Sequence, residues 1–129
     1  MIIMKDDWSN GNKGFVTQAL EKQLQEGREY DTVIAIGPLP MMKAVSEMTR
    51  PLKIRTIVSM NPIMIDGTGM CGGCRLTVGG ETKFACVDGP DFDGHLVDFD
   101  EAMARGRMFR PEEATAKEKH LCRLTGEAR

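Results

Sequence analysis

The pattern of apolar and polar residues in the first half of the chain predicts alternating helices and strands. Residues 15–26 place apolar side chains three and four positions apart, which predicts a helix with one apolar stripe and with Gly27 as its C-cap. Residues 32–36 form a continuous, largely β-branched run and predict a buried parallel strand. A helix over about residues 40–49 and a strand within residues 52–60 follow.

An apolar run at residues 1–4 adds a first strand to this series. The order is then strand, helix, strand, helix, strand, which is typical of a parallel sheet with helices packed on its faces. The first half of the chain therefore predicts an α/β fold with part of a doubly wound parallel sheet.

The second half of the chain has a different pattern. Two short candidate strands, residues 75–78 and 81–85, flank Gly79-Gly80, and this arrangement predicts a β-hairpin. The acidic residues 87–94 predict a solvated turn. Residues 99–108 predict a short helix, and residues 111–124 predict a charged C-terminal helix with a solvated face.

A glycine-rich loop before the hairpin carries the candidate chemistry, with the spacing Asp66-x4-Cys71-x2-Cys74-x11-Cys86. This spacing matches the plant-type [2Fe–2S] frame C-x4-C-x2-C…C, with an oxygen ligand in the first place. Glycine allows the positive φ angles and the close backbone approach that such a cluster needs. Backbone N–H groups that point at its sulfurs tune its reduction potential. The loop therefore indicates a [2Fe–2S] cluster and an electron carrier.

Other interpretations of the cysteines stay open. Three cysteines and one aspartate can bind zinc, which would make the chain a zinc-stabilised, non-catalytic interaction module. The loop could also hold free thiols and bind nothing. Cys122, in the last predicted helix, is either a half-buried free thiol or a replacement for Asp66 as the fourth ligand. A disulfide framework fits poorly with this spacing and with the lack of a signal peptide, and His95 and His120 are isolated.

Composition narrows the class of protein further. The chain has 129 residues, a net charge of −2 and 5% aromatic residues, and it has no basic run, so nucleic-acid binding is not expected. No apolar stretch approaches the roughly 20 residues of a membrane span, so we expect a cytoplasmic protein. The glycine-rich phosphate loop that opens a dinucleotide-binding domain is missing. We therefore expect either a fragment of a longer protein or strands supplied by another chain, and an uncovered sheet edge would favour a homo-oligomer.

Three motifs support a family resemblance. Residues 5–17 resemble the pattern T-D-D-G-S-x-G-x-K-G-x-V-T, residues 35–42 resemble A-I-G-P-x-P-M-M, and the third motif runs from the cysteine loop to residue 89. Together the motifs resemble the C-terminal part of the electron-transfer subunits of dihydroorotate dehydrogenase and of sulfide dehydrogenase, in the ferredoxin reductase-like superfamily. The dihydroorotate version usually has cysteine at the position of Asp66. Aspartate at this position resembles the small subunit of NADH-dependent reduced ferredoxin:NADP oxidoreductase.

The resemblance implies a set of cofactors, residues and partners. The residues that it implies as ligands of one [2Fe–2S] cluster are Asp66, Cys71, Cys74 and Cys86. Asp7 and the turn at Gly37-Pro38 are implied to line the nicotinamide dinucleotide site. The full-length protein is implied to bind FAD and NAD(P)H and to pair with a larger flavin and iron–sulfur catalytic subunit. The chain itself, which lacks the FAD-binding barrel, is not expected to be catalytically complete.

The resemblance and the pattern together divide the chain into three parts. Residues 1–60 are expected to be part of a nicotinamide dinucleotide-binding domain, the C-terminal half of a ferredoxin reductase-like one. Residues 61–97 are expected to form the iron–sulfur loop and hairpin, and residues 98–129 a C-terminal helical segment. The expected function is transfer of electrons between NAD(P)H/FAD and a partner subunit, as part of an NAD(P)H-linked oxidoreductase.

Overall fold

The computed structural model describes residues 14–125, with side chains up to residue 119. The elements in chain order are α1 (Val16–Gln25), β1 (Thr32–Ile36), α2 (Leu39–Thr49), β2 (Arg55–Ser59), β3 (Arg75–Val78), β4 (Glu81–Phe84), β5 (Asp91–Asp93), α3 (Phe99–Arg105) and α4 (Arg110–Thr125). Apart from β5, they match the predicted helices and strands from residue 15 onward within a few residues. The strand predicted at residues 1–4 lies outside the described part of the chain.

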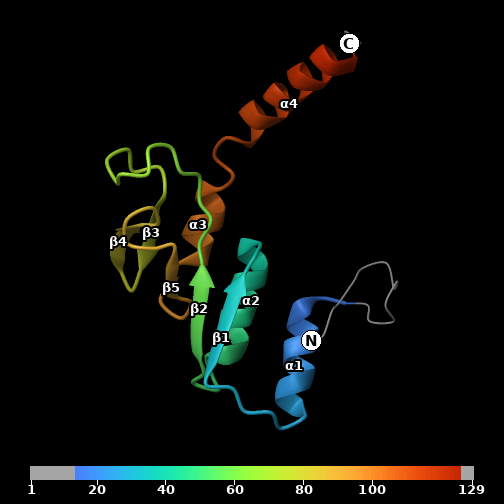
Figure 1. Cartoon of the computed structure of the whole chain (residues 1–129), viewed down its shortest axis with the longest axis vertical. Coiled ribbons are helices and arrows are strands. Elements are labelled where there is room, and N and C mark those ends of the chain that lie inside the picture. The colour runs from blue at the N-terminus through green and yellow to red at the C-terminus, as the bar shows by residue number, and fades with distance from the viewer. Residues whose placement is uncertain (1–13, 126–129) are drawn as a thin grey trace.

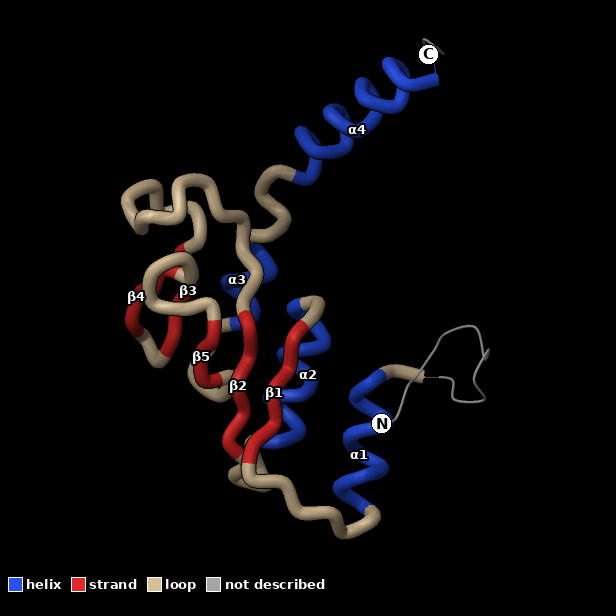
Figure 2. Tube along the Cα trace, viewed as in Figure 1, coloured by secondary structure: helices blue, strands red, loops and turns tan. Residues whose placement is uncertain are grey.

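The larger sheet has the order β1-β2-β5. Strands β1 and β2 are parallel, with Thr32 opposite Arg55 and Ile36 opposite Ser59. Helix α2 connects them and covers one face of the sheet, so the three elements form a βαβ unit (Figures 1 and 2). The α/β class is confirmed. Strand β5 runs antiparallel to β2, so this sheet is mixed, and the doubly wound arrangement stays a prediction.

The prediction of a buried strand at residues 32–36 is wrong for one face of β1. Val33 and Ala35 point toward the core, whereas the side chains of Ile34 and Ile36 are 65% and 71% exposed. The difference arises because, within the described residues 14–125, α2 covers one face of the strand and α1 packs against α2. In this part of the chain, an apolar face of the sheet is therefore open to solvent.

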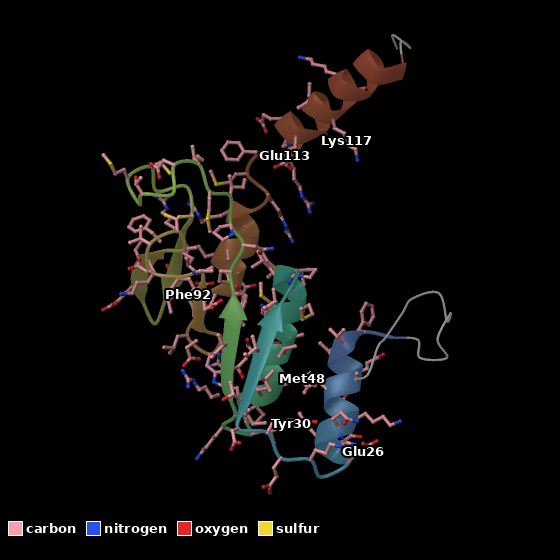
Figure 3. All side chains as sticks on the ribbon, viewed as in Figure 1. Glu26, Tyr30, Met48, Phe92, Glu113 and Lys117 are labelled. Carbon is pink, nitrogen blue, oxygen red and sulfur yellow. The ribbon has the colours of Figure 1, made fainter. Side chains whose placement is uncertain are left out.

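The prediction of a solvated turn over residues 87–94 is also wrong in part. Residues Asp91–Asp93 form β5, which pairs with the end of β2 and sets Phe92 opposite Val58. The Phe92 side chain is half-buried against the core, while both aspartates remain exposed (Figure 3). Acidic residues that alternate with one aromatic can form a strand here because β2 supplies the pairing partner.

One apolar core joins the sheet, the hairpin and α3. Its members come from different elements and include Met42 of α2, Val58 of β2, Leu76 of β3 and Phe99 of α3. The hairpin of β3 and β4 turns at Gly79-Gly80, where both φ angles are positive, +60° and +82°, as a two-residue I′-type turn requires. The core therefore fixes the hairpin and α3 relative to the sheet.

Helix α4 extends away from this core (Figure 1). Its described side chains are exposed, and Lys117 points away from the other elements (Figure 3). The predicted charged C-terminal helix is thus confirmed. In the part of the chain that the structure describes, no helix combines the length and the apolar character needed to cross a membrane.

Candidate iron–sulfur site

The candidate site lies in the loop between β2 and β3, residues 61–74, which we call the ligand loop. The loop leaves the carboxyl end of β2 and lies above the hairpin (Figure 1). Gly67, Gly69 and Gly72 have φ angles of +74°, +84° and +65°. Residues with a Cβ rarely adopt this left-handed backbone conformation, so the loop needs glycine at these positions.

The Asp66 carboxylate lies inside the ligand loop and holds its backbone. Its Oδ1 accepts a hydrogen bond from the Thr68 N–H and its Oδ2 accepts one from the Cys71 N–H, both at 2.9 Å. The Thr68 N–H, followed by smaller contributions from Cys71, holds the pKa of Asp66 below its usual value. An ionised carboxylate offers about four acceptor positions, so two backbone contacts leave room for a metal. Sequence reasoning proposed Asp66 as a ligand and missed this capping role.

The three thiols of the site differ in exposure. Cys71 is exposed, Cys74 is buried beneath the loop at 1% exposure, and Cys86 is half-buried after β4. The Cys86 N–H donates to the Cys74 sulfur at 3.5 Å, and the Gly73 N–H donates to the Cys71 sulfur at 3.4 Å. The structure thus brings Cys74 and Cys86 together, and backbone N–H groups already point at two of the sulfurs.

The pKa of the Cys86 thiol is raised, chiefly by its hydrogen bond with the Cys74 thiol and then by burial. The Gly69 backbone acts in the opposite direction and lowers this pKa. Packing places the ligand loop near Cys86, since a Cβ on Gly69 would lie 3.0 Å from Cγ2 of Val87, the next residue. The end of the hairpin and the middle of the loop are therefore neighbours.

The donor set fits an iron–sulfur cluster in its chemistry. Thiolates are the usual cluster ligands, and N–H groups directed at sulfur are the usual second layer. Among the described residues, no group of three or more His, Cys, Asp or Glu side chains is arranged to hold a single metal ion. The structure therefore does not gather all four predicted ligands, and their joint role stays a prediction. Cys122 and His120 lie beyond the described side chains.

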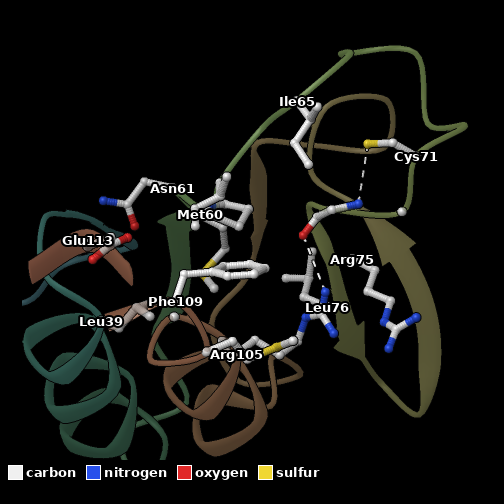
Figure 4. A pocket seen from close by; sticks show the side chains of 17 residues that line it. Leu39, Met60, Asn61, Ile65, Cys71, Arg75, Leu76, Arg105, Phe109 and Glu113 are labelled. Atoms are coloured by element: carbon white, nitrogen blue, oxygen red, sulfur yellow. Dashed lines mark hydrogen bonds between the residues drawn. The ribbon is translucent and has the colours of Figure 1, made fainter. Parts of the chain in front are cut away.

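A cavity of about 450 Å³ opens beside the ligand loop, between the end of β2 and the connection from α3 to α4. Its lining is largely apolar and includes Met60, Ile65 and Phe109, with Cys71 and Arg105 also at its wall (Figure 4). Cys71 can therefore be approached from an apolar cavity as well as from solvent. No sequence signal pointed to this cavity.

The predicted nicotinamide site is only partly described. Asp7 lies outside the described residues. Gly37 and Pro38 lie between β1 and α2, at the carboxyl end of a parallel strand. Gly37 has a φ of +155°, which residues with a Cβ rarely adopt, so this turn favours glycine. A role in binding a dinucleotide stays a prediction.

Comparison with known proteins places the site in a class. Residues 61–98 match the family model for the iron-sulfur cluster binding domain of dihydroorotate dehydrogenase B. Residues 61–98 are therefore similar to an iron–sulfur cluster binding domain. The match confirms the resemblance to the electron-transfer subunits of dihydroorotate dehydrogenase B.

Individual relatives support this assignment. The dihydroorotate dehydrogenase B (NAD(+)) electron transfer subunit homolog of Thermotoga maritima is 47% identical over 121 residues, 94% of this chain and 43% of that protein. The electron transfer subunit of Clostridium perfringens is 42% identical over 97 residues, 75% of this chain and 37% of that protein.

A solved structure is similar over nearly the whole chain. It comes from a study of flavin-based electron bifurcation in the NADH-dependent reduced ferredoxin-NADP oxidoreductase, and it matches with a TM-score of 0.82 and 47% sequence identity. The match covers 93% of this chain and 43% of the other. The chain therefore spans about two-fifths of the length of the relatives that it matches.

Proposed function

We propose that the chain is the cluster-bearing part of an electron-transfer subunit and holds one [2Fe–2S] cluster through Asp66, Cys71, Cys74 and Cys86. The observation that carries the proposal is the ligand loop itself. Its backbone is shaped by glycines and by the Asp66 caps, and three thiols lie on it or against it. When bound, such a cluster accepts and releases single electrons.

The residues of the chain supply binding, orientation and electrostatics for that chemistry. Cys74 is buried and forms the inner side of the site, while exposed Cys71 forms its outer side. The N–H groups of Gly73 and Cys86 stabilise negative charge on sulfur, because a hydrogen bond to an anion favours the charged form. The neighbouring cavity places largely apolar side chains on one side of Cys71.

The rest of the proposed electron path lies in the larger protein. We propose that FAD, reduced by NAD(P)H, and a larger flavin and iron–sulfur subunit lie on either side of the cluster. The proposed partial nicotinamide domain, residues 1–60, contains the βαβ unit, and Gly37 and Pro38 lie at its carboxyl end, where ligands bind in such sheets. The exposed Ile34 and Ile36 support a doubly wound sheet whose open face is covered by a further layer in the intact protein. We propose that the intact protein works in the cytoplasm.

A redox titration tests the proposal. The 129-residue chain is loaded anaerobically with iron and sulfide and titrated while its visible absorption and electron paramagnetic resonance are followed. We expect a reversible one-electron transition, and we expect Cys71→Ser to weaken or abolish it. A chain that shows no reducible centre and instead binds one zinc would contradict electron transfer and would favour the interaction module.

A further inference from the structure

Arg105, in the last turn of α3, reaches the ligand loop from a distant part of the chain. Its Nη2 donates a hydrogen bond to the Gly73 carbonyl at 3.3 Å, across 32 residues of sequence (Figure 4). Gly73 lies between the proposed ligands Cys71 and Cys74. The contact therefore joins a core-anchored helix to the centre of the site.

The contact fixes a peptide group next to a buried thiol. A peptide unit is planar and trans, so the N–H of Cys74 points opposite to the Gly73 carbonyl that Arg105 holds. The Gly73 N–H, in the preceding peptide, donates to the Cys71 sulfur. Arg105 thus sets the orientation of the Gly73–Cys74 peptide, next to the peptide that faces Cys71.

Helix α3 is a firm base for this contact. Its first residue, Phe99, is buried in the core, and the Asp98 carboxylate caps the helix by accepting from the Glu101 N–H at 2.9 Å. Glu101 in turn accepts a hydrogen bond from the Thr77 N–H of β3 at 3.1 Å. Because β3 begins directly after Cys74, the helix and the site are tied at two points.

Arg105 also brings a permanent positive charge to the site. Among the described residues, no carboxylate oxygen lies within 4.0 Å of its guanidinium nitrogens. An uncompensated cation beside a metal centre favours the state with the extra electron. Its removal is therefore expected to make the centre harder to reduce.

We propose that Arg105 is a positioning residue of this site. It holds the Gly73–Cys74 peptide in the orientation that receives the cluster, and it raises the reduction potential. The orienting role is a property of the chain itself, whereas the effect on the potential rests on the proposed function.

The orienting role is tested in the metal-free chain. Backbone ¹⁵N relaxation is measured for the wild type, for Arg105→Gln and for the control Arg107→Gln, which removes the same charge from an exposed residue two positions away. In Arg105→Gln, the order parameters of the Gly73 and Cys74 N–H groups are expected to fall from about 0.85 to below about 0.6. Gly79, in the hairpin turn, is expected to keep its value. Unchanged order at Gly73, or an equal fall in the control, would overturn the inference.

The same variants are then loaded with iron and sulfide. Loss of the cluster to a chelator is expected to be about tenfold faster in Arg105→Gln, with a more negative reduction potential. Arg105→Lys, which keeps the charge without the planar donor fork, is expected to fall between the wild type and Arg105→Gln. Arg107→Gln is expected to behave like the wild type.

The outcomes separate the inference from the proposed function. A wild-type chain that takes up no cluster contradicts the proposed function, while the relaxation data still decide the orienting role. A loaded wild type and an equally stable loaded Arg105→Gln overturn the inference alone. If Arg105→Gln does not fold, Arg105→Lys is measured in its place. A rate of cluster loss and a reduction potential equal to those of the wild type would then overturn the inference.

Discussion

The sheet core and the ligand loop are held in shape by different interactions. The sheet core is stabilised by buried apolar side chains from β1, α2, β2 and the residue after β2; they are Ala35, Met42, Val45, Val58 and Met60. In the ligand loop, Ile65 and Met70 are 73% and 89% exposed. The loop is instead shaped by hydrogen bonds to Asp66 and by glycines with positive φ.

This difference separates the stability of the fold from the order of the site. Apolar burial stabilises the whole domain, so loss of a buried side chain from the sheet core should lower the free energy of unfolding of the whole domain. Local hydrogen bonds and backbone geometry order only the segment that contains them. A bound metal centre would add the stabilisation that the loop does not obtain from burial.

The largest expected effect comes from the sheet core. Met42 is fully buried, so Met42→Ala should lower the free energy of unfolding by about 2–5 kcal/mol through lost burial and a cavity. Met70→Ala makes the same chemical change at an exposed position of the loop and should stay within about 0.5 kcal/mol of the wild type. Denaturant unfolding of the metal-free chain measures both variants, and equal losses would remove the distinction between the two regions.

A second comparison separates the two roles given to Asp66. Asp66→Asn keeps one acceptor for the backbone N–H groups but loses the anionic ligand, whereas Asp66→Cys offers a thiolate but loses both acceptors. We expect the asparagine variant to keep more loop order without metal and to lose the cluster. The cysteine variant should keep the cluster and show less loop order without metal.

Amide spectra of the metal-free variants and the iron content of the loaded ones measure these effects. If Asp66→Asn held the cluster as well as the wild type, Asp66 would be a cap and not a ligand.

The smallest expected effect tests backbone conformation alone. Gly67 in the loop and Gly27 after α1 have φ angles of +74° and +78°, and a Cβ on either would meet no atom within 4 Å. Replacement of either glycine by alanine should cost about 1 kcal/mol of stability through left-handed strain. Gly67→Ala should also speed cluster loss, whereas Gly27→Ala should not. Equal rates of cluster loss in the two variants would show that the loop conformation does not matter for binding.

Local patterns predicted most of the elements. The apolar stripe of α1, the β-branched run of β1 and the Gly-Gly turn of the hairpin each lie within a few residues and depend little on distant partners. The ligand spacing and the family resemblance pointed to residues 61–97, and the family model matches residues 61–98.

What local patterns missed depends on contacts between distant segments. Strand β5 forms because Phe92 pairs opposite Val58, and the acidic residues around it gave no strand signal. The exposure of Ile34 and Ile36 reflects which layers cover the sheet. The contact between Arg105 and Gly73 joins two segments whose sequences carry no mark of it.

The proposed function requires that the ligand loop and Cys86 hold a [2Fe–2S] cluster. An anaerobic visible spectrum of the 129-residue chain, with iron, sulfide and zinc counted on the same sample, tests this requirement. We expect broad absorption between roughly 400 and 550 nm and about two irons and two sulfides per chain. A colourless chain with about one zinc, which stays colourless after loading with iron and sulfide, would contradict it.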